Sequence, residues 1–335
     1  MTALEESLYP LLVLAGPTAS GKTALALRLA EELEGEIVSC DSVAVYRLLE
    51  IGSAKPTAEE RRRIAHHGID LYWPDEVCTA GDYARHAREA LAGIRDRGRM
   101  PIVTGGTGLY LRALLEGLAP APRRDEALRE RLRGRAERKG STWLHRLLQR
   151  LDPHAAALIH AHDEPKLIRS IEVTLSARHP QTEQWKVGRD PLRGYRVLQI
   201  GLAPLHSAEI RRRLYARINA RAAEMFEHGL LQETEMLRER YGDGCRSLRA
   251  LGYAQAMAVL RGELTLDAAV AKAQQGHRNY AKRQGTWFRR TTEMHWLAGF
   301  GDEQQVQEEA LALACSLPAG RAGESPGRSG TGARL

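Results

Sequence analysis

The feature that most constrains the fold is the stretch "LLVLAGPTASGKTALALRLAEEL", where a strand pattern, a loop and a helix pattern follow one another. The apolar run at residues 11–16 is short enough to be a buried parallel strand, and Leu25, Leu29 and Leu33 recur at helical spacing. Between them the sequence fits G-x-x-x-x-G-K-T in the strand-to-helix setting that this motif requires. The sequence therefore predicts a phosphate-binding loop formed by Gly16, Pro17, Thr18, Ala19, Ser20, Gly21, Lys22 and Thr23.

The chemistry of such a loop comes mainly from its backbone. N–H groups of the loop and the positive end of the following helix converge on phosphate oxygens, and Lys22 adds a point charge. The hydroxyl of Thr23 can ligate Mg²⁺. We therefore expect Mg²⁺ as the cofactor and Thr23 as its protein ligand.

Further strand patterns define the fold class. They lie at residues 36–40, 100–106 and 195–204, with helical segments between them. This alternation predicts an α/β fold, a P-loop NTPase-like parallel sheet flanked by helices.

A change of composition divides the chain. The arginine-rich stretch at residues 123–150 has helical spacing and no strand pattern. We expect residues 1–116 to form the first part of the core, 117–190 an inserted small all-helical domain, and 191–315 the second part of the core with C-terminal helices. The last residues, 316–335, lack apolar periodicity and are expected to form a disordered tail.

Composition limits the partners and the location. Lys and Arg outnumber Asp and Glu by 49 to 42, which suits a polyanionic partner and equally an ordinary solvated basic surface. No apolar run approaches a membrane span and no export signal begins the chain, so we expect a cytoplasmic protein with no membrane partner. A monomer is expected. The cysteines are too far apart to indicate a zinc site or a disulfide framework: Cys40, Cys78, Cys245 and Cys315.

Asp41 follows the second predicted strand, where the carboxyl ends of parallel strands share one crevice with the phosphate loop. The third strand ends in "TGGTGLY" and has no carboxylate, although a kinase or nucleotidase of this fold usually holds its metal with an acidic residue at a strand end. From its position alone, Asp41 can be a metal ligand, a solvated loop residue or a general base.

Four blocks together resemble the tRNA dimethylallyltransferase (tRNA isopentenyltransferase) family, bacterial type. They are "GPTASGKT", "DSVAVYRLLEIGSAKP" from Asp41, "GGTGLYLRALLEGL" from Gly105, and "RNYAKRQGTWFRR" from Arg278. The resemblance runs from about residue 10 to 297 and implies transfer of a dimethylallyl group from its diphosphate to N6 of adenosine 37, next to the tRNA anticodon. The implied partners are dimethylallyl diphosphate and the anticodon stem-loop of tRNA.

The resemblance also implies roles for individual residues. Lys22, Asp41 and Thr107 would be catalytic, and Arg221 would bind the diphosphate together with the phosphate loop. Arg217 lies four residues before Arg221, a spacing that suits joint binding of an anion. The implied tRNA contacts are Asp41, Ser42, Val43, Ala44, Thr107, Arg129, Lys166, Leu167, Ile168, Arg169, Arg249, Gly252, Tyr253, His277, Arg278, Lys282, Arg283 and Gln284.

Two departures from the family pattern affect the RNA contacts. Many members have Thr where this chain has His277, and a basic residue is common where it has Ala254. Outside the resemblance, the phosphate loop is also compatible with a P-loop small-molecule kinase or with an RNA-binding ATPase. The kinase alternative does not explain the basic and aromatic block "RNYAKRQGTWFRR", whose mixture of cations and aromatic rings suits single-stranded RNA.

Overall fold

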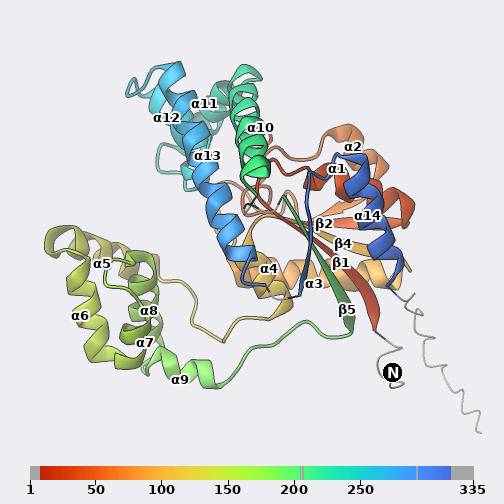
Figure 1. Cartoon of the computed structure of the whole chain (residues 1–335). Helices are drawn as coiled ribbons and strands as arrows, with labels where there is room; N and C mark the ends of the chain where they lie inside the picture. Colours follow the sequence, from red (N-terminus) through yellow and green to blue (C-terminus); the bar gives the residue numbers. More distant parts are fainter. Residues whose placement is uncertain (1–7, 204, 206, 292, 318–335) are drawn as a thin grey trace, which may run out of the picture. The chain divides into compact units, whose positions relative to one another are not determined.

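The computed structural model describes residues 8–203, 205, 207–291 and 293–317. Its contacts divide the chain into two compact units (Figure 1). The first unit is Met1–Leu114 with Leu192–Leu335, and the second is Leu115–Pro191. The sequence placed these boundaries at residues 117 and 190. Most of the tail predicted at 316–335 lies outside the described residues.

The first unit contains a six-stranded sheet in the order β3-β2-β4-β1-β5-β6. Its strands are β1 (Tyr9–Ala15), β2 (Gly35–Cys40), β3 (His66–His67), β4 (Met100–Gly105), β5 (Tyr195–Leu202) and β6 (Met294–Leu297). All pairings are parallel, which confirms the predicted parallel α/β sheet. The sequence missed the edge strands β3 and β6, because two and four residues are too short for a recognisable pattern.

The register of the sheet brings three loops to one edge. Ala15 pairs with Gly105, and Cys40 pairs with the same glycine from the other side. The chain leaves β1, β2 and β4 immediately after these residues. The phosphate loop, Asp41 and Gly106 therefore start from neighbouring positions at the carboxyl edge, as expected for an open parallel sheet.

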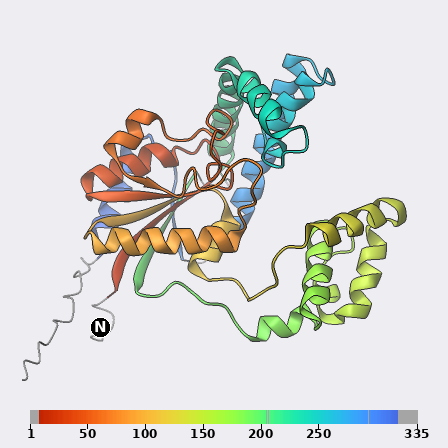
Figure 2. The same ribbon diagram turned by 180° about the vertical axis from the view of Figure 1, so that it is seen from behind.

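The helices of the first unit cover both faces of the sheet and its carboxyl edge. They are α1 (Lys22–Glu32), α2 (Ala58–Arg63), α3 (Ala80–Asp96), α4 (Gly108–Leu115), α10 (Ala208–Glu227), α11 (Leu230–Tyr241), α12 (Tyr253–Leu260), α13 (Leu266–Phe288) and α14 (Gln304–Cys315). α1 and α14 pack on one face in a core that includes Leu12, Leu25 and Val306. Figures 1 and 2 show α3 on the opposite face. The alternating side chains of the buried strands supply apolar residues to both layers.

The helices α10 to α13 form a second core beyond the carboxyl edge. It includes Leu49, Phe226 and Tyr253, so the segment that follows Asp41 is packed against these helices. α10 and α13 also pack against each other. This packing holds α10 and α13 over the ends of the strands.

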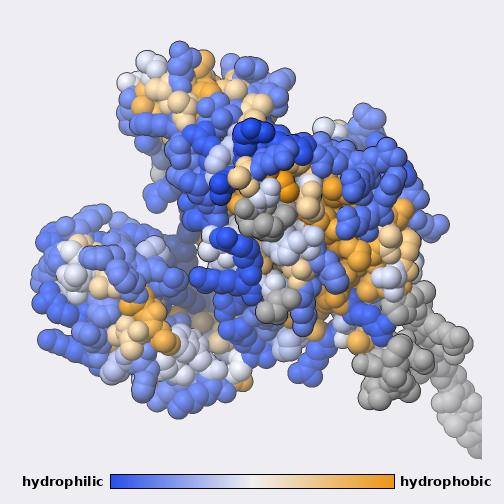
Figure 3. Space-filling view, viewed as in Figure 1, coloured by the Kyte–Doolittle hydropathy of each residue, from blue (hydrophilic) through white to orange (hydrophobic). Residues whose placement is uncertain are grey.

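The second unit is helical throughout its regular structure, with α5 (Glu126–Lys139), α6 (Ser141–Leu151), α7 (Pro153–Leu158), α8 (Glu164–Ala177) and α9 (Gln181–Lys186). Asp125, Asp152 and Asp163 cap α5, α7 and α8, since each carboxylate accepts a backbone N–H of the first turn. Leu144, Leu167 and other apolar side chains form its core. The face of this unit visible in Figure 3 is mostly hydrophilic, as expected for arginine-rich helices in contact with solvent.

A buried carboxylate organises this unit. Glu172 on α8 is fully buried and accepts hydrogen bonds from Asp125 N at 2.7 Å, Arg129 at 2.9 Å and Arg169 at 2.8 Å.

Replacing Glu172 with Ala is expected to destabilise the unit by about 3 kcal/mol, because two arginines lose their buried partner. Hydrogen exchange of α5–α8 in the full chain measures the loss. Replacing the exposed Glu130, which pairs with Arg133, is the matched control; an equal effect of both changes would contradict the prediction.

Two further observations concern the described residues alone. None of their helices is both long and apolar enough to cross a bilayer, and no group of three or more His, Cys, Asp or Glu side chains could hold a metal ion. All four cysteines are free thiols, and burial raises the pKa of Cys40 to about 12. The Cys40 thiol is therefore unsuited to act as a nucleophile, although it directly precedes Asp41.

Candidate active site

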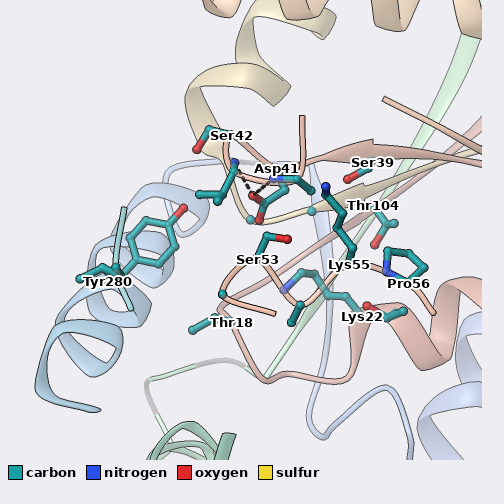
Figure 4. Close-up of a pocket in the computed structure, with 18 of the residues that line it drawn as sticks. Thr18, Lys22, Ser39, Asp41, Ser42, Ser53, Lys55, Pro56, Thr104 and Tyr280 are labelled. Carbon is teal, nitrogen blue, oxygen red and sulfur yellow. Dashed lines mark hydrogen bonds between the residues drawn. The ribbon is translucent and has the colours of Figure 1, made fainter. Parts of the chain in front are cut away.

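A cavity of about 330 Å³ lies at the carboxyl edge of the sheet (Figure 4). Its walls come from the phosphate loop, the ends of β2 and β4, the segment after Asp41, and the helices α10 and α13. Lys22, Asp41, Arg221 and Tyr280 all line it. The structure thus brings together residues that are far apart in sequence, all within the first unit.

The phosphate loop has a backbone that only particular residues permit. Gly21 lies at the start of α1 with φ of 83°, and Ala19 has φ of 62°. A Cβ on Gly21 would lie 2.6 Å from the backbone nitrogen of Gly301, which itself donates a 2.9 Å hydrogen bond to Ser20 O. Glycine at this position therefore lets the loop pack closely on the segment after β6.

Gln284 on α13 connects the phosphate loop to the turn after β4. Its Oε1 accepts Thr18 N at 2.9 Å and its Nε2 donates to Gly106 O at 2.9 Å. A Cβ on Gly106 would lie 2.1 Å from Nε2, so glycine is required there. The sequence assigned Gln284 to tRNA binding. The side chain is buried and both ends of its amide are already occupied, which corrects that assignment to a positioning role.

Replacing Gln284 with Ala is expected to weaken the binding of inorganic diphosphate about 10- to 100-fold, because Thr18 N and Gly106 O lose buried partners. Isothermal titration calorimetry measures the affinity. Thr286, an exposed residue on the same helix whose hydroxyl bonds only Lys282 O, supplies the control variant Thr286→Ala. Unchanged affinity in Gln284→Ala would show that the loop keeps its shape without this amide.

Two partly buried cations, Lys22 and Arg221, line the cavity. Lys22 Nζ donates to Pro17 O at 2.7 Å. Burial and the neighbouring Arg221 lower the pKa of Lys22 to about 7, while Asp41 opposes the shift. Burial also lowers the pKa of Arg221. An anion bound between these two side chains would relieve both effects, so the cavity is electrostatically prepared for phosphate groups.

Arg217 does not share this role, contrary to the expectation that it binds an anion jointly with Arg221. Its guanidinium makes two bonds with Asp302, at 2.9 and 3.0 Å, and a third with Ala19 O at 3.0 Å. The aspartate compensates its charge. Arg217 instead fastens the phosphate loop to the segment that precedes α14.

Asp41 occupies a tight turn at the end of β2. Its Oδ1 accepts the backbone N–H groups of Val43 at 2.7 Å and Ala44 at 3.2 Å (dashed in Figure 4). Oδ2 makes no hydrogen bond within the described part of the chain. Thr107 supports the same turn, because its Oγ1 accepts Ser42 N at 3.1 Å. One oxygen of Asp41 therefore fixes the turn and the other is available to a ligand.

An aromatic ring and exposed cations flank the cavity on α13. Burial and the nearby Asp41 raise the pKa of Tyr280 to about 12, so the phenol stays protonated. The guanidinium of Arg283 lies 5.6 Å from the centre of the Tyr280 ring. Lys282 and Arg283 are both exposed. Stacking surfaces combined with cations are typical of sites that accept unpaired nucleotides.

The remaining residues that the resemblance linked to tRNA differ in exposure. Lys166 and Arg249 are exposed. Leu167, Ile168 and Tyr253 are buried in apolar cores, which argues against contact of their side chains with any partner. The charge of Arg129 is paired with Glu172. The N–H donors of Arg278 are bonded to Asn219 and Gln275. Gly252 has φ of 89° and begins α12.

Sequence reasoning missed several residues that line the cavity: Ser39, Lys55, His66 and Thr104. The side chain of Lys55 is 1% exposed and bonds Asp70 at 2.6 Å and Glu50 at 2.9 Å. Thr104 Oγ1 and His66 Nε2 are buried without a hydrogen-bond partner in the described chain. Thr104 lies near the end of β4, next to the phosphate loop. The one sequence feature that could have drawn attention to it was the absence of a carboxylate at this strand end.

The protein oxygens near the loop suit Mg²⁺ as a minority of its ligands. Thr23, Ser39 and Thr104 line the same cavity with hydroxyl oxygens. Thr104 Oγ1 is buried and has no hydrogen-bond partner within the described residues. Hard oxygen donors fit Mg²⁺, and the lack of a carboxylate among these three means that phosphate oxygens and water would supply most of its ligands.

Comparisons with known proteins agree with this geometry. A family model described as IPP transferase matches residues 44–291, and one described as isopentenyl transferase matches residues 9–70. A tRNA dimethylallyltransferase of Koribacter versatilis is 59% identical over 303 residues, which cover 90% of this chain and 97% of the relative. Another, from Solibacter usitatus, is 50% identical and covers 90% of this chain and 97% of its own length.

A solved structure gives the same result. The crystal structure of a tRNA isopentenylpyrophosphate transferase from Bacillus halodurans matches with a TM-score of 0.65 and 34% identity, covering 91% of this chain and 96% of that chain. The resemblance found in the sequence is thereby confirmed, and the kinase alternative loses its support. The chain belongs to the tRNA dimethylallyltransferase family, the IPP transferases.

Proposed function

We propose that this protein transfers the dimethylallyl group of dimethylallyl diphosphate to N6 of adenosine 37 in tRNA and releases diphosphate. The observation that carries the proposal is one cavity that contains a phosphate loop with two partly buried cations and, beside it, a carboxylate with one oxygen that makes no hydrogen bond within the described residues. A phosphoryl-transfer enzyme would use the loop to hold the group that reacts. Here the loop holds the leaving group.

The leaving diphosphate is stabilised by the loop. As the bond between C1 and oxygen breaks, negative charge develops on the diphosphate, and Lys22 and Arg221, which line the cavity together with the phosphate loop, stabilise that charge. Gln284 and Arg217 keep the loop in shape without contacting the substrate. Mg²⁺ bound at Thr23 would add charge neutralisation on the diphosphate.

The acceptor amine is positioned by Asp41. An exocyclic adenine amine is a weak nucleophile, so its orientation toward C1 contributes as much as the removal of its proton. Oδ2 of Asp41 can accept a hydrogen bond from N6 and then its proton, while Oδ1 stays fixed by Val43 N and Ala44 N. Thr107 holds the adjacent Ser42 and is in this scheme a positioning residue.

The RNA side of the cavity is formed by α13. A base inside the anticodon loop must leave its stack to bring N6 near a buried diphosphate. Tyr280 offers a ring beside the cavity, and Lys282 and Arg283 offer charge to the phosphates of the anticodon stem-loop. The exposed Arg249 would add a further phosphate contact, and a monomer contains every group that this scheme requires.

The test is incubation of the purified protein with dimethylallyl diphosphate, Mg²⁺ and an unmodified tRNA that carries adenosine at position 37. We expect prenylated adenosine in the nuclease digest, and no product from a tRNA with guanosine at that position. ATP turnover with a small acceptor, independent of RNA and without prenylated adenosine, would instead establish the kinase alternative.

A further inference from the structure

His277 is a side chain of this cavity for which the proposed reaction has no use so far. It lies on α13, one turn before Tyr280, and is partly buried. It lines the main cavity and also a small hollow beside it, whose other polar residues are Thr18 and Arg221. The remaining walls of the hollow are apolar: Ile218, Ala222 and Met225. His277 therefore lies on the phosphate side of the cavity.

The ring has one nitrogen without a partner. His277 Nε2 is buried and makes no hydrogen bond within the described residues. A buried imidazole nitrogen without a partner is costly, so a ligand group is expected to satisfy it. Of the polar neighbours that share the hollow, Arg221 is assigned to the diphosphate by the proposed function, and Thr18 belongs to the phosphate loop.

The charges around the ring are mostly positive. Arg221 faces it from α10, Lys22 lies in the same cavity, and Arg283 lies further along α13. Asp41 is the one carboxylate among the residues that line the cavity, and Tyr280 stays protonated. Burial and Arg221 lower the pKa of His277 to about 4, so the ring is neutral in the free protein near pH 7.

We propose that His277 binds the diphosphate of the prenyl donor together with Thr18 and Arg221, and that the ring takes up a proton when the diphosphate binds. This inference rests on the proposed function, because it requires a diphosphate in this cavity. It moves His277 from the predicted tRNA contacts to the binding site of the leaving group.

The physical reason is a change in the sign of the local potential. The free cavity holds cations that repel a proton from the ring. A bound diphosphate brings several negative charges to the same place and favours the protonated ring. The protonated imidazole adds a positive charge beside the leaving group only when the anion is present, whereas a third permanent cation would raise the electrostatic cost of the free cavity. A threonine at this position would have no such property.

The experiment is calorimetry of inorganic diphosphate binding, with Mg²⁺, to the full-length protein and to His277→Thr and His277→Asn. Each titration is repeated at pH 7 in buffers that differ in ionisation enthalpy, which yields the number of protons taken up. We expect the unaltered protein to take up more protons than either variant, by a difference approaching one per site. Proton uptake by Lys22 and by the diphosphate is common to all three proteins and cancels in the comparison.

The affinity provides a second readout. From pH 8 to pH 6, the diphosphate affinity of the unaltered protein is expected to rise about tenfold relative to that of His277→Thr. His228→Asn, a change of an exposed histidine at the end of α10, is the control and should follow the unaltered protein. Thermal unfolding of each variant shows whether it is folded.

The outcomes separate this inference from the proposed function. Equal proton uptake and equal pH dependence in His277→Thr and the unaltered protein would overturn the inference alone. So would a variant that binds diphosphate normally but loses affinity for tRNA, because the ring would then serve the RNA. Failure of the unaltered protein to bind diphosphate would overturn both.

Discussion

Replacing Asp41 with Asn is expected to lower kcat about 10²- to 10⁴-fold while the affinities for tRNA and diphosphate stay within a few-fold of their original values. The reason is that Oδ1 fixes the turn whereas Oδ2 accepts the proton of N6. An asparagine keeps an oxygen that can accept Val43 N and Ala44 N, so the turn after β2 is preserved. The position of Oδ2 becomes an NH₂ group, which cannot accept a proton from the adenine amine.

Single-turnover kinetics with saturating tRNA and prenyl donor measure the loss directly. Asp41→Ala removes both oxygens and serves as the comparison, since it should add a loss of tRNA affinity from the disturbed turn. Thr107→Val tests the same turn from the other strand and should resemble a mild form of Asp41→Ala, because Ser42 N loses its acceptor. Nearly full turnover by Asp41→Asn would mean that another group, or water, removes the proton.

The sequence predicted those parts of the site that depend on short segments. The strand, loop and helix around Gly16–Thr23 are contiguous, and their geometry follows from local rules for glycine, helix ends and parallel strands. The position of Asp41 followed from one further rule, that parallel strands end at a common edge. Register pairs such as Cys40 with Gly105 bear this rule out.

Partners distant along the chain could not be predicted in the same way. Gln284 is 266 residues from Thr18, and Arg217 is 85 residues from Asp302. No local sequence pattern indicates that the amide of Gln284 accepts the backbone N–H of Thr18, or that Asp302 compensates the charge of Arg217. The four-residue spacing of Arg217 and Arg221 predicted that both would bind an anion, yet only Arg221 lines the main cavity.

Burial inside the helical unit was missed for a related reason. The resemblance assigned residues 166–169 to tRNA binding, whereas Leu167 and Ile168 lie in the core of the unit and Glu172 is fully buried. A charged residue buried by partners from another helix is indistinguishable in sequence from an exposed one. The edge strands β3 and β6 were missed because they are too short for a strand pattern, and their pairing with β2 and β5 makes them strands.

Replacing Lys22 with Met is expected to lower kcat/KM for dimethylallyl diphosphate about 10²- to 10³-fold, comparable to the loss of one essential charge-stabilising donor. The side chain keeps its length and packing, so the change removes the charge at the loop and little else. The pKa of Lys22 near 7 gives this prediction a second signature. In the free enzyme the lysine is charged below that pH and neutral above it, and the anionic donor requires the charged form.

The pH profile of kcat/KM reports groups of the free enzyme, so the unaltered protein should lose activity as the pH rises through about 7. The kcat/KM of Lys22→Met should stay low at every pH and lack this alkaline limb of the profile, since methionine has no proton to lose. Arg217→Lys, which leaves the charge of the cavity unchanged, should keep the limb. A limb that persists in Lys22→Met would assign the titration to another group, and a small loss of kcat/KM would mean that Arg221 and the loop N–H groups stabilise the departing diphosphate almost unaided.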